Sequence, residues 1–446
     1  METATQPRTI IETDDTLATA RAVLREIFGP PEARTFSVRF WDGTTEGPPE
    51  DDAEFTLVLK HPGSLRRMLL PPSEIAIGEA FLRDDFDVAG SLEAATGLDE
   101  VVKTSLRSPA RLARLVRLLR SLPDGPDDET ARKVARLDGQ RHSVERDRVA
   151  VRAHYDVGND FYRLWLDRNM VYSCAYFRDE SDDLDTAQEA KLDHICRKLR
   201  LKPGERFLDI GCGWGSLVMY AAERYGVEAT GITLSEPQAA LAQERIAAAG
   251  LADRCRIEVR DYRELPPATG FDKVASIGMV EHVGRSRLPT YFREVFRLLE
   301  PGGLFLNHGI VELPGSKPRG LSSIPTNLIW RPRSFIDRHV FPDGELIPYG
   351  ELVLAAERSG FETRDVESLR EHYALTLRHW VRRLESCREE AIALVGEPTY
   401  RVWRLYMSGS ARAFATARLN VVQTLLGKPD QNGRTSVPLT RADLYA

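Results

Sequence analysis

The sequence predicts an α/β protein, with a doubly wound, Rossmann-like sheet in its larger C-terminal part and a smaller α+β domain before it. Three observations support this prediction. Strand-like and helix-like segments alternate from Lys202 onward, a glycine-rich turn follows the first of these strands, and the first 121 residues lack that alternation. With 446 residues, the chain is long enough for two domains that each bury a core.

The N-terminal region predicts an α+β domain over residues 1–121. Residues 1–30 predict a loose or helical tail, and residues 36–41 and 54–62 predict two strands joined by a turn and a Pro- and acid-rich loop. Segments with helical spacing follow and end in a helix over 109–121.

The helix over 109–121 is predicted to be basic and amphipathic. Apolar residues alternate in it with four arginines at intervals of three: Arg111, Arg114, Arg117 and Arg120. Such helices are typical of membrane surfaces. They also occur packed on their own domain with a solvated arginine face. Both interpretations stay open at this point.

Residues 122–149 are polar and charged and contain few large apolar side chains, which predicts an exposed linker. The second domain then covers residues 150–446. Its alternating strands and helices predict a parallel sheet that is covered on both faces. A Pro- and Arg-rich insertion at 313–345 interrupts this pattern, and after one more helix and strand the domain is predicted to end in long helices.

Composition excludes several classes of protein. No stretch approaches the roughly 20 apolar residues of a membrane-spanning helix, and the absence of a secretory signal at the N-terminus predicts a cytoplasmic protein. The net charge of −6 argues against a nucleic-acid partner. The five cysteines show neither a disulfide pattern nor the spacing of metal ligands, so we expect reduced thiols and no metal.

The clearest candidate ligand site is the turn LDIGCGWG at 208–215, with Gly211, Cys212, Gly213 and Gly215. A glycine turn between a strand and a helix lets the backbone approach a ligand at the helix N-terminus. Alone it would suit NAD, FAD or S-adenosylmethionine, or a turn without a ligand. Its spacing departs from GxGxxG, so a nucleoside ligand without phosphates fits better.

The ends of the next two strands supply further candidates for that ligand. The second strand ends in Thr233, Leu234 and Ser235, with Gln238 shortly beyond, where an acidic residue commonly holds ribose hydroxyls. Hydroxyl and amide groups can make the same hydrogen bonds. Asp261, Tyr262 and Arg263 follow the third strand, where an adenine ring would lie, although an Asp in such a place is often only a turn or cap residue.

Six segments in order resemble the cyclopropane-fatty-acid synthase family, including the mycolic acid cyclopropane synthases, whose members are S-adenosylmethionine-dependent methyltransferases. The segments are HYDVGNDFYRLWLD, MVYSCAYF, LDIGCGWGSL, GITLSEPQ, IGMVEHVG and REHYALTLRHW. The resemblance covers about residues 150–425. The N-terminal region is similar to the extra domain of the longer, phospholipid-acting members.

The resemblance implies a reaction. A methyl group is transferred to the cis double bond of an unsaturated acyl chain of a membrane phospholipid, a proton is lost, and a cyclopropane ring closes. It also implies peripheral contact with the membrane, and the longer relatives suggest a homodimer. We expect the membrane contact through the basic helix or the 313–345 insertion.

The resemblance also implies two sets of site residues. The positions that match cofactor contacts are Tyr172, Ser173, Gly211, Cys212, Gly213, Gly215, Thr233, Leu234, Ser235, Gln238, Tyr262 and Arg263. The positions that match a bicarbonate site are Cys174, Glu281, His308, Ile310 and Tyr373. Tyr262 and Arg263 stand where some members have a Trp-Glu pair, so the adenine pocket differs there.

The chemistry explains why such residues are needed. An alkene is a poor nucleophile, and the carbocation left by methyl transfer must be kept from water, for which aromatic walls are suited. Aromatic residues are dense in one part of the chain, although each could equally be a core residue. These residues are Tyr155, Phe161, Tyr162, Trp165, Tyr172, Tyr176 and Phe177.

Removal of the proton requires a base. Glu281 follows the fourth strand, in the crevice where α/β sheets bind ligands, and His308 lies within the fifth strand. On the family's pattern these residues hold a bicarbonate that takes the proton, while direct action of Glu281 stays open. A covalent role for Cys174 is disfavoured. The alternative functions are a methylene- or methyl-branching enzyme, a small-molecule N-methyltransferase and a lipid-binding module without activity.

Overall fold

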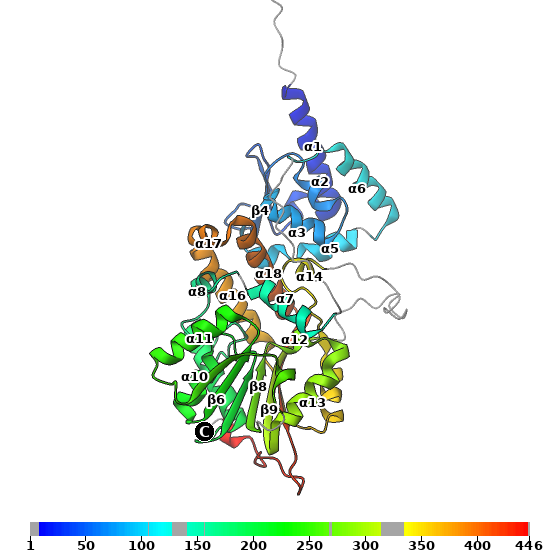
Figure 1. Cartoon of the computed structure of the whole chain (residues 1–446). Coiled ribbons are helices and arrows are strands. Elements are labelled where there is room, and N and C mark those ends of the chain that lie inside the picture. The colour runs from blue at the N-terminus through cyan, green and yellow to red at the C-terminus, as the bar shows by residue number, and fades with distance from the viewer. Residues whose placement is uncertain are drawn as a thin grey trace, which may run out of the picture. The chain divides into compact units, whose positions relative to one another are not determined.

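The computed structural model describes residues 9–105, 107–126, 141–155, 157–266, 270–313 and 334–444 (Figure 1). The chain divides into two compact units. The first consists of Met1–Lys133, Arg333–Phe335 and Gly396–Arg412, and the second of Val134–Pro332, Ile336–Val395 and Ala413–Ala446. No helix among the described residues is long and apolar enough to cross a membrane.

The second unit is built on one large sheet in the strand order β11-β12-β9-β8-β5-β6-β7. Its strands are β5 (Arg206–Ile210), β6 (Glu228–Thr233), β7 (Cys255–Val259), β8 (Phe271–Ile277), β9 (Leu299–Glu312), β11 (Glu362–Ser368) and β12 (Leu419–Gly427), and the short β10 (Ile347–Pro348) pairs with β9. Neighbouring strands from β7 to β9 are parallel, whereas β12 is antiparallel to β9 and to β11. The chain order reverses beside β5, so the predicted doubly wound α/β class is confirmed.

Helices cover both faces of this sheet (Figure 1). They are α9 (Leu184–Leu199), α10 (Ser216–Tyr225), α11 (Glu236–Ala248), α13 (Leu288–Leu298) and α15 (Tyr349–Arg358). Neighbouring strand residues point to opposite faces: Phe207 of β5 packs with α9, α10 and α11, and Leu208 packs with α13. Residues 207–210 of β5 are buried on both faces of the sheet, as is typical of a parallel sheet that is covered on both sides.

The remaining elements of the second unit lie around the sheet. They are α7 (Val144–Tyr155), α8 (Asn159–Trp165), α12 (Val280–Val283), α14 (Phe335–His339), α16 (Arg370–Ser386) and α17 (Arg388–Val395). Two of the structure's features differ from the expectations. The chain was expected to end in long helices, but the strand β12 follows them, and the linker expected over 122–149 includes the start of α7. Ion pairs connect the start of α7 to the rest of the unit, since Arg146 pairs with Asp343 and Asp147 with Arg263.

The first unit contains a four-stranded sheet in the order β2-β1-β3-β4, which confirms a small α+β domain. Its strands are β1 (Ser37–Arg39), β2 (Thr45–Glu46), β3 (Phe55–Leu59) and β4 (Phe86–Gly90). Its helices are α1 (Thr9–Phe28), α2 (Ser64–Leu69), α3 (Glu74–Leu82), α4 (Leu92–Ala95), α5 (Leu98–Ser105) and α6 (Pro109–Ser121). The described part of the expected tail is helical and not loose, because Val23, Leu24 and Ile27 of α1 are buried in the core.

Helix α6 turns its apolar side inward and its arginines outward. Leu115 and Leu119 are buried in the core of the first unit. Arg111 lies 3.2 Å and Arg114 lies 3.7 Å from the carboxylate of Glu26 on α1. The structure therefore favours the interpretation of α6 as a helix packed on its own domain with a solvated arginine face.

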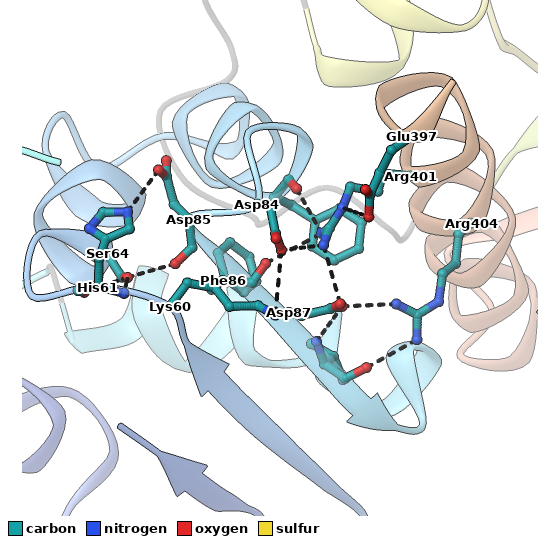
Figure 2. A network of polar contacts seen from close by, with 12 residues as sticks. Lys60, His61, Ser64, Asp84, Asp85, Phe86, Asp87, Glu397, Arg401 and Arg404 are labelled. Atoms are coloured by element: carbon teal, nitrogen blue, oxygen red, sulfur yellow. Dashed lines mark hydrogen bonds and ion pairs between the residues drawn. The ribbon is translucent and has the colours of Figure 1, made fainter. Parts of the chain in front are cut away.

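Most of helix α18 (Glu397–Ala415) belongs to the first unit, although the sequence assigned residues 396–412 to the second domain. Figure 2 shows the reason. Arg401 is only 3% exposed; it donates to the Phe81 carbonyl at 2.9 Å, pairs with Asp84 and Asp87, and lies over the Phe81 ring. Arg404 donates to Asp87 at 3.0 Å. Ion pairs thus hold α18 against the turn between α3 and β4, and no sequence pattern marks the charged residues that form them.

Candidate active site and its cofactor pocket

A cavity lies at the carboxyl ends of β5, β6, β7 and β8, where the chain order of the sheet reverses. Counted with its open mouth, it has a volume of about 1230 Å³. Its wall includes residues that directly follow these strands, residues 170–173 before α9, Lys191 of α9, Asp209 of β5 and Asp147 of α7. This is the position at which doubly wound sheets bind nucleotide ligands.

Most of the predicted cofactor contacts line this cavity. They are Tyr172, Ser173, Gly211, Cys212, Gly213, Thr233, Leu234, Gln238, Tyr262 and Arg263. Gly215 and Ser235 do not line it, and each has a local structural role. Gly215 has a φ of +80°, and a Cβ there would lie 3.1 Å from Ala242. The Ser235 hydroxyl accepts a hydrogen bond from the backbone N–H of Gln238 and so caps α11.

The end of β6 presents hydroxyl and amide groups instead of an acid. Thr233 Oγ1 donates to Gln238 Oε1 at 2.9 Å, and both side chains are buried. Because the carbonyl of Gln238 is already held, the orientation of its amide is fixed. Such a pair can bond the hydroxyl groups of a ribose without adding a charge.

Two carboxylates hold Arg263, which lines the cavity after β7. Its guanidinium donates to Asp261 at 2.8 Å and 2.7 Å and to Asp147 at 3.0 Å. Asp261 also accepts from the backbone N–H of Arg263, so the cap interpretation of this Asp applies as well. The sequence analysis missed Asp147, because it lies in the segment expected to be a linker.

Buried aromatic residues form a continuous group beside Tyr172. Phe161, Tyr162 and Trp165 of α8 are buried, and the Tyr162 and Trp165 rings each lie 5.5 Å from the Tyr172 ring. Trp214 and Trp380, absent from the predicted aromatic set, extend the group at ring distances of 5.0 Å from Tyr162 and 5.2 Å from Tyr172.

Two other predicted aromatic residues, Tyr176 and Phe177, stack on histidines. Tyr176 stacks between two imidazoles, with ring distances of 4.2 Å to His194 and 5.0 Å to His372. Phe177 stacks on His379 at 5.5 Å. The side chain of Tyr155 lies outside the described residues. Of the predicted aromatic side chains that the structure describes, only Tyr172 lines the cavity.

Glu281 lies in α12, directly after β8. Its Oε1 accepts a hydrogen bond of 2.6 Å from the backbone N–H of Ile310. Its Oε2 is buried and has no hydrogen-bond partner among the described residues. Loss of solvation raises the pKa of Glu281 to about 7, so its carboxyl group can exchange a proton near neutral pH.

His308 and Ile310 are two residues apart on β9, so their side chains lie on the same face of the strand. The His308 ring is buried, and its Nδ1 lies 3.2 Å from Nε2 of Gln423 on β12. Burial lowers the pKa of His308 to about 3, so the ring is neutral. The strand that the sequence analysis missed thus supplies the residue that contacts this imidazole.

Cys174 and Tyr373 meet at one backbone carbonyl. Leu369 O accepts from the Tyr373 backbone N–H at 3.0 Å and from Cys174 Sγ at 3.7 Å. The backbone N–H of Leu369 donates to Val421 O, and Val421 lies opposite Ile310 in the pairing of β12 with β9. Burial raises the pKa of the Cys174 thiol well above its usual value, which leaves it a poor nucleophile.

Five residues were predicted to form the bicarbonate site: Cys174, Glu281, His308, Ile310 and Tyr373. None lines the cavity, although their sequence neighbours Ser173 and His282 do. The contacts described above join Glu281 to Ile310 and Cys174 to Tyr373 by way of Leu369. Among the residues that the structure describes, no group of three or more His, Cys, Asp or Glu side chains could hold a metal ion.

Comparison with known proteins gives the family. Residues 142–424 match the model of the family described as mycolic acid cyclopropane synthetase, and residues 23–106 match a domain of unknown function. A protein of Pseudomonas putida named "Probable fatty acid methyltransferase" is 40% identical over 411 residues, which cover 92% of this chain and 95% of that protein.

Two further relatives are informative. The cyclopropane-fatty-acyl-phospholipid synthase of Escherichia coli strain K12 is 37% identical over 65% of this chain and 71% of its own length. The crystal structure of mycolic acid cyclopropane synthase CmaA1 with SAH and CTAB has a TM-score of 0.57 and 35% identity, and covers 63% of this chain and 97% of that one. The chain therefore belongs to the mycolic acid cyclopropane synthetase family and is an S-adenosylmethionine-dependent methyltransferase.

Proposed function

We propose that this enzyme methylates the cis double bond of an unsaturated acyl chain in a membrane phospholipid and closes a cyclopropane ring after loss of a proton. The observation that carries the proposal is the buried Glu281 carboxyl group, which Ile310 holds at Oε1 and which has no partner at Oε2 among the described residues. An amine acceptor would need no base for a carbon-bound proton. The names of the relatives from Pseudomonas putida and Escherichia coli also support a lipid substrate.

The cavity fits S-adenosylmethionine, which supplies the methyl group when bound. Gly211 and Gly213 leave the backbone accessible, Thr233 and Gln238 present groups for the ribose, and Tyr262 lies where the adenine is expected. The Tyr262–Arg263 pair replaces the Trp-Glu pair of some relatives. Since Arg263 is neutralised by Asp261 and Asp147, this exchange leaves no free cation beside the adenine.

The aromatic group protects the reacting carbons. Methyl transfer to an alkene leaves a carbocation, which water would convert to an alcohol. The rings of Tyr172 and Trp214, which line the cavity, would keep water away, and their faces favour positive charge. Tyr162, Trp165 and Trp380 pack against Tyr172 and support it. The transfer also depends on positioning of the double bond against the methyl group, because an alkene has no proton that a base could remove beforehand to make it more nucleophilic.

The residues around Glu281 fit a bicarbonate ion, which supplies the base for proton removal when bound. The backbone of Cys174 and Ile310 and the side chains of Glu281, His308 and Tyr373 would hold it. His308 is a neutral imidazole, Cys174 is a thiol, and Glu281 holds its proton up to about pH 7. The site therefore presents little negative charge to repel an anion, and Oε2 of Glu281 is available to it.

The acyl chain lies in a bilayer, so the enzyme must reach the membrane surface, and we propose that it does so from the cytoplasm. The outward arginines of α6 support contact with anionic headgroups, without insertion of Leu115 or Leu119, which are buried. Residues 314–333 of the insertion lie outside the described residues, so its proposed contact rests on the sequence alone. Dimerisation also stays a prediction.

The test is expression in a bacterium that lacks its own cyclopropane synthase, followed by mass spectrometry of total fatty acid methyl esters. We expect acyl chains that gain one methylene, lose the double bond and resist hydrogenation. Glu281→Gln should abolish this product. A gained methylene that hydrogenates would favour the second candidate, a methylene- or methyl-branching enzyme. Unchanged lipids would contradict the proposal and direct attention to small amines.

A further inference from the structure

The buried side chain of Gln423 on β12 has no role in the mechanism above. Gln423 lies directly opposite His308 in the antiparallel pairing of β12 with β9, so both side chains are on the same face of the sheet. Gln423 is fully buried and His308 is 2% exposed. The Oε1 atom of Gln423 is buried and has no hydrogen-bond partner among the described residues. An apolar side chain would avoid the cost of this unpaired oxygen, so the amide requires an explanation.

The contact between the Gln423 amide and the His308 ring provides one. Nε2 of Gln423 lies 3.2 Å from Nδ1 of His308. The NH2 group of an amide can only donate, so Nδ1 has to accept and cannot carry a proton. The ring is neutral, because burial and the positive charges of Lys191 and Lys198 disfavour a second proton on it. A neutral imidazole holds one proton, which must then be on Nε2.

The proton on Nε2 makes this nitrogen a hydrogen-bond donor. Nδ1 and Nε2 point away from each other, so Gln423 does not compete for Nε2. Nε2 forms no hydrogen bond with the residues that the structure describes. A donor that the protein leaves without a partner suits a ligand that accepts, such as an oxygen atom of an anion. The opposite tautomer would present a lone pair there and would repel the same oxygen.

We propose that Gln423 is a positioning residue that keeps the proton of His308 on Nε2, so that His308 donates to the anion of the base site and is not itself the base. Gln423 acts only through the ring, as the outer partners of ligand histidines do in metal sites. The position of the proton does not depend on the acyl substrate, whereas its importance for catalysis rests on the proposed function.

Nitrogen NMR of the full chain tests where the proton lies. Labelling with 15N-histidine limits the ring signals to nine residues, and His308→Gln identifies the signals of His308 by their loss. The 15N shifts of the two ring nitrogens report which of them is protonated. We expect a protonated Nε2 and an unprotonated Nδ1 in the wild type. Added sodium bicarbonate should shift the Nε2 signal.

Two variants of similar size change the partner of Nδ1. Gln423→Met removes the donor, so we expect both tautomers and an affinity for bicarbonate that is lower on the order of 10- to 100-fold, the range for a hydrogen bond to a charged group. Gln423→Glu replaces the donor with an acceptor, so the proton should move to Nδ1 and the bicarbonate shift should disappear. Both variants should methylate lipid more slowly. Their affinity for S-adenosylhomocysteine should be unchanged, because neither Gln423 nor His308 lines the cavity.

Thr424→Val is the matched control. Thr424 is the next residue of β12, is 1% exposed and faces the opposite side of the sheet. This variant also removes a buried polar group from the strand. It should keep the proton on Nε2, the bicarbonate shift and the rate of methylation.

Several outcomes would overturn the inference. They are a proton on Nδ1 in the wild type, a wild type without a bicarbonate shift, a proton that stays on Nε2 in both Gln423 variants, and an equal loss of bicarbonate affinity in Thr424→Val. A proton on Nδ1 and a lost bicarbonate shift in Gln423→Glu support it. If the wild type methylates no lipid, the proposed function fails, but the NMR measurements still decide the inference, because they use no lipid.

Discussion

The carboxyl group of Glu281 accepts a 2.6 Å hydrogen bond from the backbone N–H of Ile310, which joins α12 to β9. This bond orients the carboxyl group. It leaves Oε2 buried and without a hydrogen-bond partner among the described residues. The carboxyl group is therefore held by one oxygen and available through the other, which is the arrangement expected of a group that exchanges a proton.

Glu281→Gln should separate catalysis from cofactor binding. The amide keeps the size of the side chain and can still accept from Ile310, but it cannot gain or lose a proton. We expect the rate of product formation to fall on the order of 100-fold or more, the usual contribution of an acid or base. Affinity for S-adenosylhomocysteine should be unchanged, because Glu281 does not line the cavity. Glu300→Gln, at an exposed pair with Arg206, is the control and should keep full activity.

The same variant should change how stability depends on pH. In the folded protein the pKa of Glu281 is raised from 4.5 to about 7. Between these values the unfolded chain releases the proton and the folded chain keeps it, so the free energy of unfolding of the wild type falls as pH rises. At pH values above both pKa values, the contribution of Glu281 to the free energy of unfolding is lost completely.

Glu281→Gln removes this contribution. Relative to the wild type, the variant should gain up to about 3 kcal/mol of stability between about pH 5 and pH 8. Urea unfolding followed by tryptophan fluorescence at several pH values measures the difference. A constant difference between the two proteins across this range would contradict the raised pKa.

Arg263→Ala should weaken both the fold and cofactor binding. The substitution leaves the buried Asp261 and the neighbouring Asp147 without their cation. Loss of one partner from such a group costs about 3 kcal/mol. We expect a lower melting temperature and weaker binding of S-adenosylhomocysteine in calorimetry. Adding Asp147→Ala to Arg263→Ala should restore part of the stability, because it removes one unpaired carboxylate; a further loss of the same size would argue against the coupling.

Arg401→Met should destabilise the first unit by about 3 kcal/mol, since it removes a buried cation bonded to two carboxylates and a carbonyl. Arg401→Lys should recover only part of this loss, because an ammonium group lacks the planar fork that reaches all three partners. Thermal unfolding of the full chain measures both variants. Arg117→Met, an exposed arginine on α6, is the control and should leave the transition in place.

Reversing the charge of α6 should abolish binding to anionic membranes. Arg114, Arg117 and Arg120 are exposed, and each basic residue near such a surface contributes about 1 kcal/mol. The triple change to Glu should lower co-sedimentation with anionic vesicles and leave the weak binding to zwitterionic vesicles unchanged. Arg254→Glu with Arg256→Glu, also exposed but on the second unit, is the control. Unaltered vesicle binding in the triple variant would exclude α6 as the contact.

The sequence predicted the central strands well, because β5 to β9 alternate with helices along the chain and a glycine-rich turn marks the end of β5. Strand β12 was missed, since it follows three helices and its run LNVVQTLLG has no regular alternation. Helix α7 was missed because its start is highly charged, and Arg146 and Asp147 there form ion pairs with residues far along the chain. A single sequence does not show such pairs in advance.

The candidate site was predicted through motifs, and residues outside the motifs were missed. Asp209 stands within a motif, but an acid inside an apolar strand gives no sign of whether its oxygens are satisfied. Lys191 had a usable signal. The buried residues of α9 recur at helical spacing as Leu184, Gln188, Lys191, Ile195 and Lys198, which places both lysines on the inner face. Lys191 lines the cavity and Lys198 does not, and this difference depends on neighbours far along the chain.

The contribution of α18 to the first unit affects the order in which the protein can fold during synthesis. N-terminal domains commonly fold first, as soon as they leave the ribosome. Here Asp84 and Asp87 must wait for Arg401 and Arg404, which are made only after nearly the whole second unit. The N-terminal unit is therefore completed late, and a ribosome that stalls before residue 396 releases a chain whose first unit lacks one of its helices.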